Sequence, residues 1–494
     1  MMQCSRSRCA LLIYSLVFLI SFFGTAEATD PVKKDCPMKS KQPLHYRPAE
    51  GRLADTIPFF WKGDYHIFYL RGNIGKVPWE HLVSKDLITW KELPTALVSD
   101  GDPDGPDGEH MFTGSVTERD GTFHIFYTGW NPRNKAGREW VMHATSSDLI
   151  HWTKHPEHKF RADEVHYQNT DFRDPYVFWN PADESFWMIL CARDAKTGQP
   201  VQGKARSKDL LHWNQEPPLA LDPPLGEGTP ECPDLFQIGD TWHLLNSPCA
   251  GVTDMRYSSD INGPFKLPKT PSIDTPILYA AKRMFDGERH IITGWLRDLG
   301  GGKDSGDFRW GGAQSLPREV YAGPQGQLFF RPIPAAIELF TQTCVDLNSP
   351  TSSAEGVEKK DNEVLLSTKS RLSYHVPEDF FLEALVHPEG NAQVQLCFRV
   401  QEDPKAGYCL TLKPSENRVS LSSPAFNYER AIYPESWKEI RVQAFLEGST
   451  LECFINDAYA FSCRCYDYTS GDFAIGAENG SAKVSQLQIR TQGD

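Results

Sequence analysis

The sequence predicts an all-β chain, a five-bladed β-propeller followed by a C-terminal β-sandwich. Three observations predict this fold. Short apolar runs alternate with turns rich in Gly, Asn and Asp along the whole chain. A Ser-x-Asp-Leu-x-x-Trp phrase recurs roughly every 50 to 60 residues, as expected for stacked supersecondary units. No long amphipathic helical pattern separates the strand-like runs, which disfavours an α/β barrel.

The repeated phrase begins at Ser84, Ser146 and Ser207, with a weaker fourth copy at Ser258. Its Ser and Asp side chains can cap a tight turn by bonding to the backbone, while Leu and Trp pack between neighbouring units. A fifth unit lacks the phrase but keeps two strand-like runs, at 277–281 and 290–295. Five four-stranded units fit a five-bladed propeller, and we interpret the phrase as structural rather than catalytic.

Three carboxylates stand just before the apolar strands that open three of these units, Asp55, Asp174 and Glu231, and each precedes a proline. If the units surround an axis, these acids occupy the same place in three copies and converge. A single acid before a strand is usually a solvated turn residue, whereas for three in phase with a repeat an active site and solvated turns are about equally open. Cleavage of a sugar acetal needs two carboxyl groups, one to protonate the leaving oxygen and one to attack carbon or activate water. A third can hold sugar hydroxyls, and Arg173 is placed to keep Asp174 ionised.

The first 28 residues are typical of an export signal. Arg6 and Arg8 precede an apolar run from 10 to 23, and Ala26-Glu27-Ala28 fits a small-x-small cleavage site. An uncleaved anchor is the alternative, but the run is short for a membrane-spanning helix. We therefore expect a secreted protein, extracellular or periplasmic, with no membrane partner after signal cleavage.

Composition narrows the class of partner. The formal net charge of −14 argues against nucleic acid, which would require a basic surface. Thirteen Trp and 12% aromatic residues suit sheets and sugar-binding surfaces. We expect an oligo- or polysaccharide substrate, and the sequence gives no indication of the oligomeric state.

No cofactor and no metal site are expected. The chain has no CxxC pair, zinc-finger spacing, HExxH, EF-hand, P-loop or GxSxG pattern. The segment His155-Pro156-Glu157-His158 lies in a polar loop, and we interpret it as surface. Disulfides and buried free thiols remain equally open for the cysteines in strand-like runs, which are Cys191, Cys249, Cys397, Cys409, Cys453, Cys463 and Cys465.

The pattern changes near residue 335. A short linking helix is expected at 335–340, and a polar stretch follows at 349–363. Period-two alternation then continues to the end, for example at 392–398 and 451–455, which favours a β-sandwich. The expected domains are a signal peptide at 1–28, a catalytic propeller at 29–335, a linker at 336–362 and a sandwich at 363–494.

Several motifs, in order, resemble one family. The segment 79–87 is similar to its WGHxxSxDL stretch, and 112–115 to its FSGS motif. Residues 173–175 match RDP, 231–236 match ECPDLF, and 451–457 resemble a VEVFVND strand. The chain thus resembles glycoside hydrolase family 32, the invertases, inulinases, levanases and other β-fructofuranosidases, across both predicted domains.

The resemblance implies a five-bladed propeller with a sandwich, and retaining hydrolysis of terminal β-fructofuranosyl units of sucrose or fructans. By position, Asp55 would be the nucleophile, Glu231 the general acid/base and Asp174 the transition-state stabiliser. The residues implied to line the sugar pocket are Arg173, Trp79, Phe112, Ser115 and Trp295.

The nucleophile motif departs from the family pattern. The family has a motif close to WMNDPNG, and here the segment reads Ala54-Asp55-Thr56-Ile57-Pro58, so the Asp is kept and its Asn neighbours are not. Glu80 replaces the Gly of WGH, and we expect it to add a charge to the pocket. Two alternatives stay open: the same machinery acting on another furanoside, such as an arabinofuranoside, or a carbohydrate-binding protein without catalysis.

Overall fold

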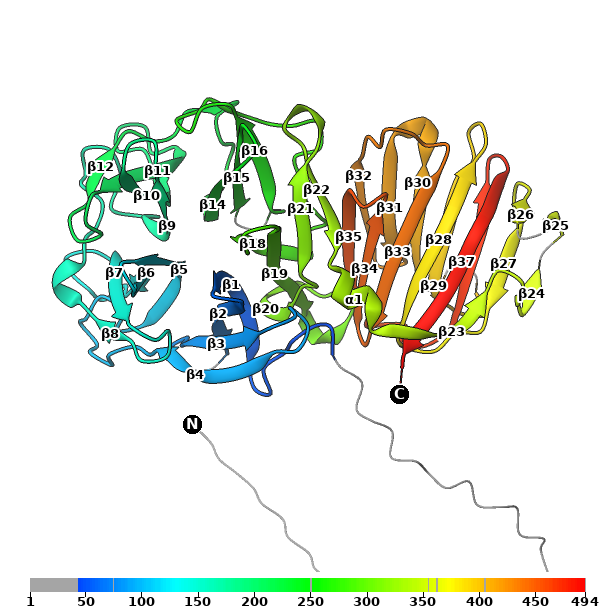
Figure 1. Ribbon diagram of the computed structural model, residues 1–494, viewed down its shortest axis with the longest axis horizontal. Coiled ribbons are helices and arrows are strands. Elements are labelled where there is room, and N and C mark those ends of the chain that lie inside the picture. Colours follow the sequence, from blue (N-terminus) through cyan, green and yellow to red (C-terminus); the bar gives the residue numbers. More distant parts are fainter. Residues whose placement is uncertain are drawn as a thin grey trace, which may run out of the picture. The chain divides into compact units, whose positions relative to one another are not determined.

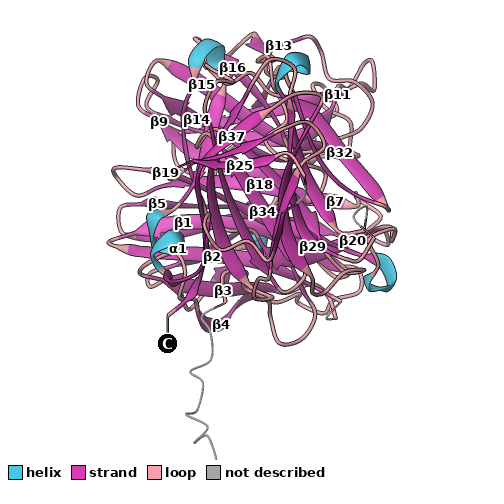
Figure 2. Ribbon diagram, turned by 90° about the vertical axis from the view of Figure 1, so that its right-hand side faces the viewer, coloured by secondary structure: helices cyan, strands magenta, loops and turns pink. Residues whose placement is uncertain are grey.

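The protein is built almost entirely from β-strands (Figures 1 and 2). The structure, a computed structural model, describes residues 43–493 except 74, 249–250, 354, 361–362 and 404–405. The prediction of an all-β chain is confirmed. The expected signal peptide at 1–28 lies outside the described residues. Within the described part, no helix combines the length and apolarity needed to cross a membrane.

Residues 52–332 contain five groups of consecutive strands, most of them antiparallel. The first group is β1 (Arg52–Trp61), β2 (Asp64–Gly72), β3 (Trp79–Ser84) and β4 (Lys91–Leu97). The second is β5 (His110–Arg119), β6 (Thr122–Trp130), β7 (Glu139–Ser146) and β8 (Thr153–Lys154), followed by the 3₁₀ turn η1 (Pro156–His158). The third is β9 (Arg173–Asn180), β10 (Ser185–Arg193), β11 (Pro200–Ser207) and β12 (Asn214–Glu216).

The fourth and fifth groups complete this part of the chain. The fourth is β14 (Pro230–Ile238), β15 (Thr241–Pro248), β16 (Asp254–Ser258) and β17 (Phe265–Lys266), joined by β13 (Leu221–Asp222). The fifth is β18 (Leu278–Phe285), β19 (His290–Leu299), β20 (Phe308–Gln314), β21 (Arg318–Ala322) and β22 (Leu328–Pro332), with turns η2 (Gly300–Gly302) and η3 (Pro324–Gly326). The first and fifth groups share one nine-stranded sheet through β1 and β20.

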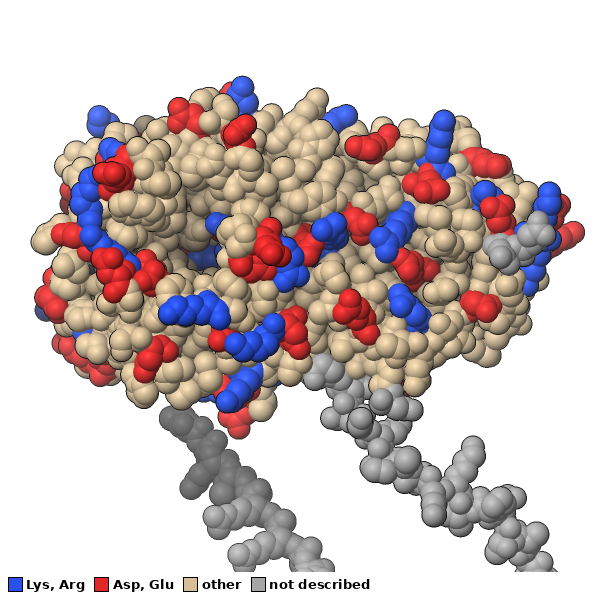
Figure 3. Space-filling view, in the orientation of Figure 1, with Lys and Arg blue, Asp and Glu red and all other residues tan. Residues whose placement is uncertain are grey.

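The first strands of the five groups contact one another in a ring: β1 with β5, β5 with β9, β9 with β14, β14 with β18, and β18 with β1. On the face drawn in Figure 3, the surface is hollowed where Figure 1 places β1, β5, β9 and β14 around a common centre. Acidic and basic side chains are interspersed around this hollow. The ring therefore brings residues from all five groups toward one axis.

In the first four groups, the repeated phrase forms the turn that follows the third strand. In the first copy, Ser84 Oγ accepts the Leu87 N–H at 2.8 Å, and Asp86 Oδ1 accepts the Ile88 N–H at 2.9 Å. The second and third copies repeat the Asp-to-backbone bonds at Asp148 and Asp209. The Leu of each copy is buried. These contacts confirm a structural role for the phrase.

The C-terminal part consists of two sheets around one shared apolar core. The eight-stranded sheet contains β23 (Phe340–Asp346), β25 (Val357–Lys360), β26 (Glu363–Leu366), β28 (Phe380–Pro388), β33 (Ile440–Glu447), β34 (Thr450–Ile455), β35 (Tyr459–Arg464) and β37 (Ala482–Gln492). The seven-stranded sheet contains β24 (Ser352–Ser353), β27 (Arg371–Tyr374), β29 (Gln393–Val400), β30 (Tyr408–Lys413), β31 (Arg418–Ser423), β32 (Phe426–Ala431) and β36 (Asp472–Glu478). A fourth 3₁₀ turn, η4 (Pro414–Glu416), follows β30.

The predicted linker at 336–362 needs correction. A short helix, α1 (Pro334–Glu338), stands where one was expected. However, β23, β24 and β25 lie within the supposed linker and pair with β37, β27 and β26. The prediction failed because these peripheral strands are mostly exposed and polar, so they lack the apolar alternation of a half-buried strand.

Six of the eight described cysteines are free thiols, and two form a disulfide. Cys397 on β29 is bonded to Cys409 on β30. Cys344 is exposed, and the other five free thiols are buried, namely Cys191, Cys232, Cys453, Cys463 and Cys465. Cys249 lies outside the described residues. Both alternatives left open by the sequence therefore occur, at different positions.

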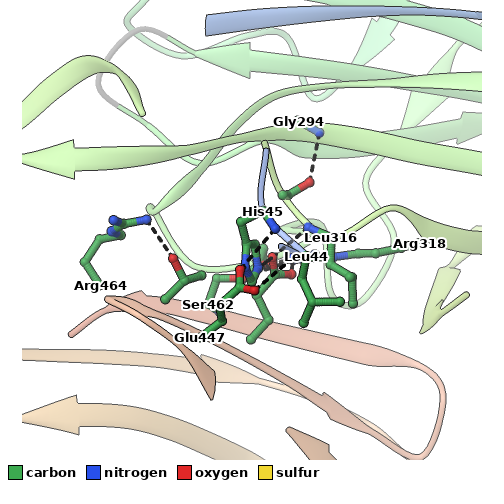
Figure 4. Close-up of polar contacts among 12 residues, drawn as sticks. Leu44, His45, Gly294, Leu316, Arg318, Glu447, Ser462 and Arg464 are labelled. Atoms are coloured by element: carbon green, nitrogen blue, oxygen red, sulfur yellow. Dashed lines mark hydrogen bonds and ion pairs between the residues drawn. The ribbon is translucent and has the colours of Figure 1, made fainter. Parts of the chain in front are cut away.

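A buried polar cluster joins the fifth strand group to the eight-stranded sheet (Figure 4). Arg318 of β21 bonds to Asp274 at 2.6 Å and to Glu452 of β34 at 2.5 Å, and its Nη2 donates to Ser462 Oγ at 3.0 Å. Arg318 and Asp274 are each 1% exposed, and Glu452 is fully buried. Because these ionised groups are removed from water, breaking one of these ion pairs would strongly destabilise the fold.

His45 connects the N-terminal segment to the same cluster. Its ring nitrogens lie 2.8 Å from Glu447 and 3.1 Å from Glu452. Burial alone would lower the pKa of His45, but the bonds to these two carboxylates outweigh it and raise the pKa to about 9. His45 is therefore a buried cation at neutral pH.

We expect the stability of the protein to fall between pH 6.5 and 9 because of His45. An unfolded histidine titrates near 6.5, so its stabilising effect is complete below that pH and is lost as pH rises through 9. The loss should be roughly 2–3 kcal/mol. Urea unfolding at pH 6 and pH 9.5 should show it in the wild type and not in His45→Gln. Equal losses in both proteins would refute the assignment.

Candidate active site

A pocket of about 400 Å³ lies at one end of the ring of first strands. It contains all three acids that the sequence singled out. Its lining is Asp55, Phe112, Arg173, Asp174, Glu231, Cys232, Tyr279, Trp295, Arg297, Phe308, Arg309 and Trp310. The carboxylates come from β1, β9 and β14, so residues far apart in sequence share one site.

Each first strand carries a register irregularity of the β-bulge type beside the pocket. The last paired residues before the irregularities are Ala54, Phe112, Arg173, Glu231 and Tyr279. In four strands the next residue has a positive φ: 40° at Asp55, 60° at Asp174, 51° at Cys232 and 50° at Ala280. Bulges re-aim neighbouring side chains, and left-handed non-glycine residues concentrate at functional sites.

The prediction that the three acids hold the same place in their strands is wrong for Glu231. Asp55 and Asp174 follow the last paired residue, whereas Glu231 is itself that residue. Its counterparts on the two neighbouring strands are Arg173 and Tyr279, and both bond to it. The three acids still converge, because the irregularity in each strand directs the side chains of two successive residues toward the pocket.

Glu231 is held by groups from both neighbouring strands. Arg173 Nη2 donates to Oε1 at 3.0 Å, and the Tyr279 hydroxyl lies 2.6 Å from Oε2. The same hydroxyl lies 2.8 Å from the Ser247 carbonyl oxygen. Its single proton can go to Glu231 when that carboxyl is ionised, or to Ser247 when Glu231 carries the proton. Tyr279 is thus able to bond to Glu231 in either protonation state.

Asp55 is buried, with 8% of its surface exposed. Its Oδ1 accepts the Trp295 indole N–H at 3.0 Å. Burial raises the pKa of Asp55 to about 7, and the negative charges of Asp174 and Glu231 add to this, against smaller opposing effects of Trp295 and Lys282. Ionised Asp55 is therefore costly in the pocket without a positive charge beside it.

Asp174 is even less exposed, at 3%. Its backbone N–H donates to Thr128 Oγ1 at 2.8 Å, and its Oδ2 accepts the Cys232 N–H at 2.9 Å. Burial raises the pKa of Asp174 to about 6, although the Arg173 charge works against this rise. The adjacent-strand bond to Cys232 fixes this carboxyl next to Glu231.

Three of the five predicted pocket residues line the pocket, namely Arg173, Phe112 and Trp295. Trp79 and Ser115 stand behind the wall. The Trp79 indole donates to the Phe112 carbonyl at 3.1 Å, so it supports Phe112 from beneath. Ser115 Oγ donates to the Pro175 carbonyl and accepts the Val177 N–H, both at 2.9 Å, so it ties β5 to β9.

The expected extra charge of Glu80 does not reach the pocket. Glu80 lies on β3, the third strand of its group, and pairs with Arg71 at 2.8 Å. It also accepts a bond from Thr95 at 2.7 Å. The expectation is therefore corrected: the charge is neutralised away from the site.

Sequence reasoning missed the far wall of the pocket. Tyr279 could have been found, because it holds the register position of Glu231 in the next first strand. The Arg297 guanidinium stacks 4.1 Å from the Tyr279 ring centre and 4.8 Å from that of Phe308. The β19–β20 hairpin that supplies Arg297 and Phe308 belongs to the group without the repeated phrase, so no periodic signal marks it.

Comparison with known proteins places most of this chain in one family. The model of the glycosyl hydrolases family 32 N-terminal domain matches residues 45–332, which include the whole pocket. An insoluble β-fructofuranosidase isoenzyme of Arabidopsis thaliana is 27% identical over 322 residues, covering 58% of this chain. The match spans only 58% of that relative, less than two thirds of its length.

Two further relatives align along most of the chain. Fructan 1-exohydrolase w2 of Triticum aestivum is 27% identical over 527 residues, covering 91% of this chain and 87% of that protein. The crystal structure of a fructan 1-exohydrolase IIa variant from Cichorium intybus in complex with 1-kestose superposes with a TM-score of 0.72 at 19% identity. It covers 91% of this chain and 97% of that one. The structural likeness shows a shared fold.

Proposed function

This chain belongs to family 32 of the glycoside hydrolases, and we propose that it is a retaining exo-hydrolase that releases terminal β-fructofuranosyl units from sucrose or fructans. The observation that carries the proposal is the meeting of Asp55, Asp174 and Glu231 in one pocket inside the matched domain. Its relatives are named as β-fructofuranosidases and fructan exohydrolases.

In the first step, Glu231 gives its proton to the glycosidic oxygen as the bond between that oxygen and the anomeric carbon breaks. The Asp55 carboxylate attacks the anomeric carbon from the opposite face and forms an ester with the sugar. The Tyr279 hydroxyl keeps a bond to Glu231 while the latter passes from acid to base.

In the second step, Glu231 removes a proton from water, and the water oxygen attacks the anomeric carbon. The ester bond breaks, fructose leaves with retained configuration, and both carboxyl groups return to their starting states. Asp174, fixed by Cys232, is placed to accept bonds from sugar hydroxyls.

The electrostatics of the pocket support this chemistry. Burial raises the pKa values of Asp55 and Asp174, and the charges of the neighbouring carboxyl groups add to the cost of ionising each of them. A positively charged, oxocarbenium-like transition state relieves that cost, because its charge develops between preorganised acids. The pocket is therefore better suited to the transition state than to a neutral sugar.

The finer architecture is part of the proposal. The closed ring of contacts among β1, β5, β9, β14 and β18 supports a five-bladed β-propeller. The two sheets of the C-terminal part, which share one core, support a β-sandwich. Secretion is proposed from the signal-like residues 1–28, and the Cys397–Cys409 disulfide suits an oxidising compartment.

Sugar release should test the substrate class directly. Purified chain is incubated with sucrose, inulin, levan and an aryl arabinofuranoside, and NMR identifies the first anomer formed. We expect fructose from at least one fructoside, released as the β-anomer. Release of arabinose alone would move the substrate to another furanoside. Sugar binding without any released product would contradict the proposal that the protein is an enzyme.

A further inference from the structure

A histidine cluster lies in the second strand group, at the end of β8 and the turn η1. It consists of His124, His143, His155 and His158, with Glu157 beside the last two. None of these residues lines the acid pocket. The sequence alone indicated a surface role for the loop at 155–158, and the fold adds two strand histidines behind it.

Three potential ligand atoms converge at the loop. His155 Nδ1 lies 3.2 Å from Glu157 Oε1, and His158 Nε2 lies 3.8 Å from the same oxygen. One ligand atom from each of the three residues falls within 4.8 Å of the others. Tetrahedral zinc with bonds near 2.0–2.1 Å places neighbouring ligand atoms about 3.3 Å apart, so only small side-chain adjustments are needed.

The hydrogen bonds behind the loop can orient His158 as a ligand. His158 Nδ1 lies 3.0 Å from His143 Nδ1, and His143 Nε2 lies 2.9 Å from His124 Nδ1. A neutral His143 supplies one ring proton. When that proton is on Nε2 and faces His124, His143 Nδ1 accepts from His158, and the Nε2 of His158 is left bare toward Glu157. The two strand histidines thus act as the outer layer that fixes a ligand's tautomer.

His155 is oriented by a second contact. Its Nε2 lies 2.8 Å from Thr145 Oγ1. When Nε2 carries the proton and donates it to that hydroxyl, Nδ1 is left bare and faces the Glu157 carboxylate. In that tautomer the Nδ1 lone pair and the carboxylate oxygen face each other at 3.2 Å, an arrangement that a bound cation would satisfy.

The first strand group provides an internal comparison. His66 and His81 make the same pair there, with Nδ1 and Nε2 2.9 Å apart. No convergent set of three His, Cys, Asp or Glu ligand atoms is found at that pair among the described residues. The paired strand histidines are therefore a packing feature of the repeat, and the loop residues His155, Glu157 and His158 are the addition specific to the second group.

We propose that His155, Glu157 and His158 bind a divalent transition-metal ion of the zinc type, with His143 and His124 positioning His158. Two imidazoles and a carboxylate are a ligand set that suits zinc, and they leave a fourth position for water. His155 and His158 have about a quarter of their side-chain surfaces exposed, so an ion can enter from solvent. The bound ion would hold the loop after β8 against the sheet.

Calorimetric titration of the untagged, EDTA-treated chain with Zn²⁺ tests the site. We expect one zinc ion per chain in the wild type, and loss of that binding in His155→Asn/His158→Asn. We expect no change in His212→Asn, a matched control on the next repeat whose ring pairs with Asp209. His143→Gln, which replaces the imidazole bonded to His158, should weaken zinc affinity about 10–100-fold. Thermal unfolding in EDTA confirms that each variant is folded.

Co²⁺ gives a second readout of the same site. Wild-type protein should show the visible absorption of cobalt in a four-coordinate nitrogen and oxygen site, and the double variant should not. His143→Gln should need more Co²⁺ to reach the same spectrum, which a purely structural role of His143 would not produce. Absence of zinc binding in the wild type, or equal binding in the double variant, would overturn the proposal.

Discussion

Asp55→Asn is expected to lower turnover by roughly 10⁴-fold or more while the protein stays folded. The amide keeps the shape of the side chain and can still accept the Trp295 N–H, which lies 3.0 Å from Oδ1 in the wild type. It cannot form the ester intermediate, because an amide oxygen is a poor nucleophile. Turnover on the best fructoside from the sugar-release screen measures the effect.

The same substitution should stabilise the fold at neutral pH. The pKa of Asp55 is raised from 3.8 to about 7, so the unfolded chain ionises this group at a lower pH than the folded protein does. The folded state therefore loses stability as pH rises from 3.8 through 7. Asparagine removes that loss, which we place at roughly 2–4 kcal/mol. Urea unfolding at pH 7.5 should show a higher midpoint for the variant than for the wild type.

Glu231→Gln provides the companion test, with a loss of similar size because the leaving oxygen is no longer protonated. Asp240→Asn is the matched control, since Asp240 is exposed in the turn at the opposite end of the β14–β15 hairpin. Wild-type turnover in Asp55→Asn would remove the proposed nucleophile. A drop in the control as large as in Glu231→Gln would show that the losses are not specific to the pocket.

Arg318→Met is expected to destabilise the protein by roughly 3–5 kcal/mol, the largest stability effect we anticipate. The substitution leaves Asp274 and Glu452 buried without their shared cation. It also removes the hydrogen bond that Arg318 donates to Ser462, which joins the fifth strand group to β35. The apolar stem of Met fills similar space, so the cost arises from uncompensated charge rather than from a cavity.

Chemical denaturation should compare Arg318→Met with Arg331→Met, a half-exposed arginine paired with Glu319 that should cost little. Adding Asp274→Asn to Arg318→Met removes the charge stranded at Asp274 and should recover part of the loss, while Glu452 keeps its bond to His45. If the double variant is no more stable than the single one, the charge explanation fails. A loss of stability in Arg331→Met equal to that in Arg318→Met would also contradict the charge explanation.

The repeat predicted much of this protein's architecture from the sequence alone. Ser84, Ser146 and Ser207 marked the turns, because a side chain that caps its own backbone acts over only a few residues. Asp55 and Asp174 were found by their phase in the repeat. The sequence predicted a linker where the polar strands β23, β24 and β25 lie, because peripheral strands lack the apolar alternation by which strands are recognised.

By itself, the sequence determined the all-β class, the turns and the three acids, since each depends on local patterning repeated along the chain. Only the tertiary structure decided that Tyr279 and Arg173 flank Glu231, that Trp79 and Ser115 stand behind the pocket wall, and that four histidines gather at η1. These partnerships join residues tens to hundreds of positions apart, as Asp55 and Trp295 do. They are set by the bulges and by the packing of separate strands, which a local pattern does not encode.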